Sequence, residues 1–93
     1  MANEDKRHYF YVLQCADASF YAGYTTDPER REKEHNNGIG SKYTKMRRPV
    51  QMIHEKGFET RSEATKAEYA FKQLTRRQKE IRLREWKKEI PDD

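Results

Sequence analysis

The sequence has few hydrophobic residues and no long apolar run. Hydrophobic residues make up 33% of the 93-residue chain, whereas Asp, Glu, Lys and Arg make up 39%. No stretch approaches the roughly 20 apolar residues that a transmembrane helix needs. Residues 1–7 also lack the apolar segment of a signal peptide. We therefore expect a cytoplasmic protein without a membrane partner.

Cysteine is almost absent, because Cys15 is the only one in the chain. No internal disulfide can form, which fits a reducing compartment. Cys15 lies in a strand-like segment, where we predict a small core residue rather than a nucleophile. The three histidines (His8, His35 and His54) lack zinc-like spacing, and one cysteine cannot complete a zinc site. The sequence therefore predicts neither a disulfide scaffold nor a zinc centre.

Aromatic and basic residues are abundant by comparison. Six Tyr, four Phe and one Trp lie within patterned segments, which favours a folded chain over a disordered one. The length predicts a single domain over residues 1–93, with its core at about 8–88. The net charge is +4, and 20 basic residues are interleaved with the aromatic ones. This pattern indicates either a nucleic-acid partner or an ordinary solvated surface.

The order of the expected elements predicts an α+β fold. Aromatic and aliphatic residues predict strands at 8–14, 20–24 and 50–55. Three capping boxes predict helix starts: Thr26 with Glu29, Thr60 with Glu63, and Thr75 with Gln78. Residues 38–48 between the first helix and the third strand are predicted to form a flexible basic loop. The order strand, strand, helix, strand, helix, helix predicts a three-stranded antiparallel sheet flanked by three helices.

Polar residues on these elements could carry chemistry. Arg31 and His35 are four residues apart, so they project from one face of the first helix. This helix has no apolar residue between positions 29 and 37, so it either packs through polar side chains or lines a functional cleft. Tyr11 and Tyr21 lie on neighbouring strands and serve either as core residues or as phenols that orient or deprotonate a water molecule. A nearby Arg31 would favour the second role by lowering a phenol pKa.

Two further features suit a nucleic-acid site. Glu68 borders an apolar helix stripe, where it either pairs with a cation or binds Mg²⁺, which one carboxylate and phosphate oxygens can hold. The segment between residues 42 and 48 alternates basic and aromatic side chains. Such a segment either binds phosphates and stacks on bases or is an ordinary surface loop. Its candidate binding residues are Lys42, Tyr43, Lys45, Arg47 and Arg48.

The ordered set of motifs resembles the GIY-YIG nuclease superfamily over about residues 9–74. The first tripeptide of that family is matched in degenerate form by Tyr9-Phe10-Tyr11, and the second by Tyr21-Ala22-Gly23. The family's arginine, histidine and metal-binding glutamate are matched by Arg31, His35 and Glu68. Further matches, at residues 41–44 and 74–76, are similar to a small stand-alone bacterial branch related to structure-specific nuclease subunits.

The resemblance implies an endonuclease that hydrolyses DNA phosphodiester bonds at a single Mg²⁺ (or Mn²⁺) site. RNA remains an alternative substrate, and a structure-specific role in repair or recombination is implied. Tyr11 would be the general base, assisted or replaced by His35, and Tyr21 would position both Tyr11 and the phosphate. Arg31 would stabilise charge at the scissile phosphate, and Glu68 would hold the metal.

The chain also departs from the family pattern. An apolar residue often follows the family's arginine, but here Glu32 does, which bears on how the first helix packs. The added recognition domain of sequence-specific relatives is missing from these 93 residues, so we do not expect sequence-specific cutting unless a protein partner supplies the targeting. The alternative is a non-catalytic module that binds nucleic acid or docks a partner. The oligomeric state does not follow from the sequence.

Overall fold

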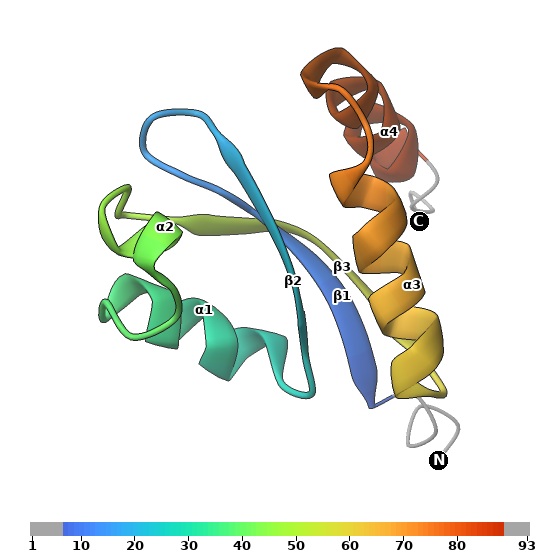
Figure 1. The fold of residues 1–93 in the computed structure, drawn as a ribbon, viewed down its shortest axis with the longest axis horizontal. Helices are drawn as coiled ribbons and strands as arrows, with labels where there is room; N and C mark the ends of the chain where they lie inside the picture. The colour runs from blue at the N-terminus through green and yellow to red at the C-terminus, as the bar shows by residue number, and fades with distance from the viewer. Residues whose placement is uncertain (1–6, 89–93) are drawn as a thin grey trace.

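The protein folds as an antiparallel sheet between two layers of helices (Figure 1). The structure is a computed structural model that describes residues 7–88. Its elements are β1 (His8–Gln14), β2 (Phe20–Thr25), α1 (Pro28–Asn36), α2 (Lys42–Lys45), β3 (Gln51–Phe58), α3 (Arg61–Lys72) and α4 (Arg76–Lys88). Helices α1 and α2 lie on one side of the sheet, and α3 and α4 on the other (Figure 1). No helix within the described residues is long and apolar enough to cross a membrane.

Strand β1 is the centre of the sheet, whose strand order is β2-β1-β3. Both neighbours are antiparallel to β1, as the sequence predicted. Because side chains alternate along a strand, β1 contributes to two separate cores. Phe10 and Val12 pack with Phe71 on the side of α3 and α4. Tyr11, Leu13 and Cys15 pack with Val50 on the opposite side, so the prediction of Cys15 as a core residue is confirmed.

The start of α1 differs from the prediction by one residue. Asp27, rather than Thr26, is the N-cap, and its side chain accepts a hydrogen bond from the Arg30 backbone N–H at 3.1 Å. Pro28 then takes the first helical position, where a missing N–H has no cost. The capping box at Thr60 and Glu63 is confirmed.

The segment between α1 and β3 is more ordered than predicted. It contains the four-residue helix α2, which begins because the Ser41 side chain accepts a hydrogen bond from the Thr44 backbone N–H. The expectation of a flexible loop throughout residues 38–48 was therefore wrong. Strand β3 is also longer than the predicted 50–55, because Gly57 and Phe58 still pair with β1.

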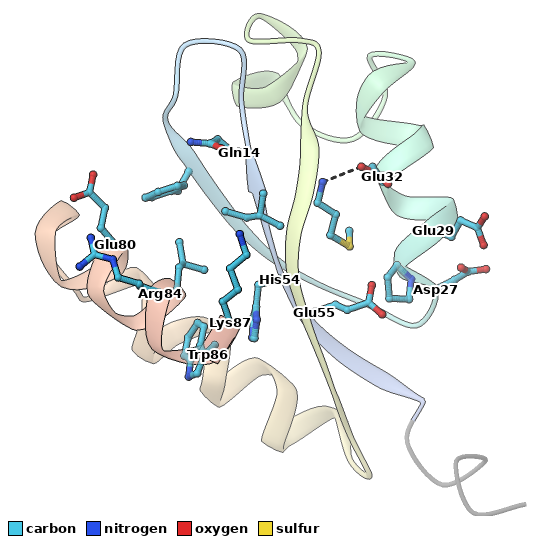
Figure 2. Close-up of a pocket in the computed structure, with 15 residues that line it drawn as sticks. Gln14, Asp27, Glu29, Glu32, His54, Glu55, Glu80, Arg84, Trp86 and Lys87 are labelled. Carbon is cyan, nitrogen blue, oxygen red and sulfur yellow. Dashed lines mark hydrogen bonds between the residues drawn. The ribbon is translucent and has the colours of Figure 1, made fainter. Parts of the chain in front are cut away.

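Helix α1, which has no apolar residue after Pro28, packs against the edge of β3 through polar side chains. The Asn36 amide donates to the Val50 carbonyl at 2.9 Å and accepts from the Val50 N–H at 2.8 Å. The Glu32 carboxylate accepts from the Met52 N–H at 2.8 Å (Figure 2). These side chains satisfy backbone groups that an edge strand would otherwise leave unpaired. A glutamate after Arg31 is therefore compatible with a packed helix.

Candidate active site

The phenol of Tyr11 is the centre of the candidate site. Tyr11 is 1% exposed and pairs across the sheet with Gly23 on β2. A Cβ atom at position 23 would collide with the Tyr11 hydroxyl, so glycine is needed for the ring to lie over β2.

His35 on α1 contacts Tyr11 from the α1 side of the sheet. Its Nε2 lies 2.8 Å from the Tyr11 hydroxyl, and its Nδ1 lies 2.7 Å from Thr44 Oγ1. The ring is completely buried. Burial, together with the charge of Arg31, lowers the pKa of His35 to about 4. His35 is therefore neutral at pH 7, with one nitrogen protonated and the other free to accept a hydrogen bond.

Arg31 lies one helical turn before His35 and contacts the same phenol. Its Nε donates to the Tyr11 oxygen at 3.4 Å, and its Nη2 donates to the Gly40 carbonyl at 3.2 Å. Its Nη1 forms an ion pair with Glu34 at 2.8 Å, and 29% of the Arg31 side chain is exposed. The guanidinium is thus both within reach of Tyr11 and open to a ligand from solvent.

The pKa of Tyr11 is raised above its ordinary value. Burial is the largest cause, whereas the hydrogen bond and the positive charge of Arg31 lower it. Tyr21 and the carboxylate of Glu68 act in the same direction as burial. The resting site therefore holds a neutral phenol beside a neutral imidazole.

Tyr21 and Tyr43 extend the site along the sheet. The Tyr21 ring lies edge-on to His35 with centroids 5.2 Å apart, and it stacks with Tyr43 at 5.9 Å. The Arg47 guanidinium covers the Tyr43 ring at 3.7 Å. Tyr21 is thus placed to hold the His35 ring, while Tyr43 is 37% exposed.

Glu68 lies on α3 and is linked to the site through its charge. Its charge acts on Tyr11, its side chain is 20% exposed, and it pairs with Lys72 at 2.8 Å. Within residues 7–88 no group of three or more His, Cys, Asp or Glu side chains could hold a metal ion. A single carboxylate fits Mg²⁺, which keeps several water ligands and binds substrate phosphates as well. The ion pair between Glu68 and Lys72 joins partly exposed side chains, so a metal cation can displace Lys72 from Glu68 at low cost.

The predicted nucleic-acid-binding residues fall into two groups. The side chains of Lys42 and Lys45 are exposed on α2 and make no hydrogen bond or ion pair with the other described residues. Arg47 binds the Asp17 carboxylate and the Tyr43 carbonyl, at 3.1 and 3.0 Å. Arg48 donates to the carbonyls of Lys45 and Asn36. The two arginines thus fix the shape of this segment, whereas the two lysines leave their charges in solvent.

A groove elsewhere contains none of these residues. Its volume is about 1080 Å³, and it follows β3 between α1 and α4 (Figure 2). Five carboxylates and two cations line it: Asp27, Glu29, Glu32, Glu55, Glu80, Arg84 and Lys87. An acidic groove does not suit a phosphate backbone, so it is not part of the candidate active site.

Sequence reasoning missed Thr44 and Gly40. Thr44 is fully buried and bonded to His35, and a Cβ atom at Gly40 would collide with the His35 ring. The Ser41-to-Thr44 spacing was a signal for a short helix start, but nothing in the sequence indicated that Thr44 faces a histidine.

Comparison with known proteins shows the family to which the chain belongs. The model of the GIY-YIG catalytic domain matches residues 7–81. A UPF0213 protein of Enterococcus faecalis is 69% identical over 81 residues, which cover 85% of this chain and 92% of that protein. A UPF0213 protein of Listeria innocua is 62% identical over 88 residues, which cover 95% of this chain and 94% of that protein.

A solved structure is similar over most of its length. The solution NMR structure of a protein from E. faecalis is 61% identical to this chain, with a TM-score of 0.61, and 92% of each chain is covered. Family match, sequence identity and fold therefore agree. The chain belongs to the GIY-YIG catalytic domain family and resembles its small bacterial UPF0213 members.

Proposed function

We propose that this protein is a metal-dependent endonuclease that hydrolyses phosphodiester bonds in DNA, with branched or damaged structures as the preferred substrates. The observation that carries the proposal is the buried Tyr11 hydroxyl, held between Arg31 Nε and His35 Nε2. Core packing requires neither of these polar partners. Hydrolysis of a phosphodiester can use both, since it needs a proton acceptor and a cation beside the phosphate.

The protein's own groups supply a path for the proton of the attacking water. As the water attacks phosphorus, its proton passes to the Tyr11 oxygen, and the Tyr11 proton passes to His35 Nε2. The phosphorus–oxygen ester bond then breaks, and the leaving oxygen takes a proton from solvent. With a His35 pKa of about 4, charging this ring at pH 7 costs about 4 kcal/mol. The negative charge of a bound phosphate raises that pKa and reduces the cost.

Arg31 is the residue that recognises the scissile phosphate in this proposal. Its guanidinium is charged at every physiological pH and offers a planar fork of donors. A phosphate would compete with Glu34 for Nη1, and movement of Arg31 toward it would uncover the Tyr11 oxygen. Tyr21 keeps the His35 ring in place through its edge contact.

Glu68 would hold the metal, Mg²⁺ or Mn²⁺, at a single site. When bound, the ion supplies positive charge that polarises the phosphate and stabilises the leaving oxygen. Lys42, Tyr43 and Lys45 would contact the nucleic acid beyond the scissile bond, with Arg47 and Arg48 supporting them. A protein partner would supply targeting.

The test is nicking of labelled linear, flapped and four-way DNA with Mg²⁺ or with EDTA. We expect cleavage with Mg²⁺ only. Tyr11→Phe and Glu68→Gln should each lower kcat by about 10²-fold or more, since general base and electrostatic contributions are of that size. Both variants should keep most of their DNA affinity.

Two matched variants control for the substitutions themselves. Tyr69→Phe changes a tyrosine that is 67% exposed on α3, and Glu85→Gln changes an exposed carboxylate on α4. Both should cleave like the wild type, provided that all proteins are purified identically to exclude trace nucleases. Salt-sensitive binding without metal-dependent cleavage would reject the enzyme and favour a nucleic-acid-binding or partner-docking module.

A further inference from the structure

The second ring nitrogen of His35, Nδ1, has a fixed partner that lies outside the proton path. Thr44 is completely buried, and its Oγ1 lies 2.7 Å from His35 Nδ1. Thr44 is itself held by Ser41, the N-cap of α2: Ser41 Oγ lies 3.0 Å from Thr44 Oγ1, and the Ser41 carbonyl accepts from it at 3.4 Å. A buried threonine hydroxyl with partners on both sides is a constrained hydrogen-bonding group rather than a simple core side chain.

Counting protons along the series of hydrogen bonds from Arg31 through Tyr11, His35 and Thr44 to Ser41 selects one tautomer of His35. Arg31 Nε can only donate, so the Tyr11 oxygen accepts there and gives its own proton to His35 Nε2. The proton of His35 must then be on Nδ1, where it is donated to Thr44 Oγ1. The Thr44 hydroxyl in turn donates to Ser41. Every member of the chain has a partner in this arrangement.

The other tautomer breaks the chain at the phenol. With the proton on Nε2, His35 and Arg31 would both donate to the Tyr11 oxygen, and the Tyr11 proton would have no acceptor among the described residues. An unmatched donor in a buried site costs about 1–3 kcal/mol. It would also leave His35 unable to accept the proton that Tyr11 has to release.

We propose that Thr44 is a positioning residue that holds His35 in the Nδ1–H tautomer, so that Nε2 stays free to accept the Tyr11 proton. Ser41 orients the Thr44 hydroxyl for this role. Gly40 allows it, because a side chain there would collide with the Nδ1 edge of the ring. The proposal deepens the proposed function and rests on it, since the tautomer matters to catalysis only if Tyr11 passes a proton to His35.

The tautomer can be measured without any substrate. Long-range ¹H–¹⁵N spectra of histidine-labelled protein distinguish protonated from unprotonated ring nitrogens, and His35→Gln identifies the His35 signals. We expect Nδ1–H in the wild type and in Thr44→Ser, which keeps the hydroxyl. In Thr44→Val, which has the same shape but no acceptor, we expect a shift toward Nε2–H.

Cleavage kinetics give the second readout. Thr44→Val should lower kcat by at least about 10-fold, up to the 10²- to 10⁴-fold that general base catalysis contributes, with KM unchanged. Thr44→Ser should restore kcat to within a few-fold of the wild type. A loss from damaged packing alone would raise KM as well and would not be rescued by serine.

The two proposals fail in different ways. A wild-type His35 that carries its proton on Nε2, or a folded Thr44→Val that cleaves like the wild type, overturns the role of Thr44. If the wild type does not cleave DNA at all, the proposed function fails, while the spectra still decide the tautomer. If Thr44→Val does not fold, the wild-type and Thr44→Ser spectra remain decisive.

Discussion

At the scale of single residues, the site depends on placing polar side chains in a dry environment. His35 is completely buried and yet makes hydrogen bonds at both ring nitrogens. Its neutral form fits this site, whereas its charged form loses the solvation of water and lies near Arg31. The same burial that keeps the ring neutral at pH 7 therefore makes the protein sensitive to acid.

The stability of the protein should fall with pH because of His35. The pKa of this histidine is about 4 in the folded protein and 6.5 in the reference state. Between these values the unfolded chain binds a proton and the folded chain does not, so stability is lost as the pH falls through the window. Above pH 6.5 the contribution is constant. At about 1.4 kcal/mol for each pH unit, the loss reaches about 3 kcal/mol near pH 4.

Urea unfolding, followed by Trp86 fluorescence from pH 7.5 to 4.5, measures this loss. His35→Gln should show a smaller slope of free energy against pH than the wild type. Comparing slopes removes the contributions that both proteins share, including those of the carboxylates and of His54, whose pKa is lowered by burial and by Lys56. Equal slopes would show that His35 is already charged, or already solvated, in the folded state.

At the scale of elements, α1 shows how a helix without an apolar stripe can be fixed. One face presents Arg31 and His35 to Tyr11. Another presents Glu32 to the edge of β3 (Figure 2) and Asn36 to Val50, the residue before β3. The contacts beside β3 hold the helix in register, and this register brings Arg31 and His35 to the phenol. Packing and function therefore depend on neighbouring polar residues of a single short helix.

Asn36 and Asn37 form a natural pair for testing this packing. Asn36→Ala removes both hydrogen bonds to Val50, and the partly buried backbone groups left behind should cost about 1–3 kcal/mol of unfolding free energy. Asn37→Ala changes an exposed side chain and should stay within about 0.5 kcal/mol of the wild type. Urea denaturation of both variants measures the difference. Equal effects would mean that α1 is held mainly by other contacts.

The limits of sequence reasoning also appear at this scale. The strands and the capping box at Thr60 are local properties, and the sequence predicted them apart from the end of β3. The polar composition of α1 showed that its packing had to be unusual, but the choice of β3 as its partner depends on tertiary contacts between Asn36 and Val50. Thr44 was missed for the same reason, because a threonine in a basic segment has no local sign that it faces a distant histidine.

At the scale of the whole molecule, charge is distributed unevenly around the sheet. In the groove along β3, five carboxylates outnumber two cations, although the protein as a whole has a net charge of +4. Helix α2 instead carries the exposed Lys42 and Lys45 beside Tyr43. Charge therefore favours a polyanion beside α2 over one in the groove.

This asymmetry predicts which cations control the salt dependence of DNA binding. Each phosphate contact contributes about 0.9 to the slope of log K against log salt concentration for duplex DNA. The double change Lys42→Gln and Lys45→Gln should therefore reduce the slope by up to about 1.8. The double change Arg84→Gln and Lys87→Gln removes the same charge from the groove and should leave the slope nearly unchanged. Fluorescence anisotropy across a salt series, with Ca²⁺ in place of Mg²⁺ for all three proteins, measures both slopes. If the two doubles reduced the slope equally, only total charge would matter, and a binding surface on α2 would be rejected.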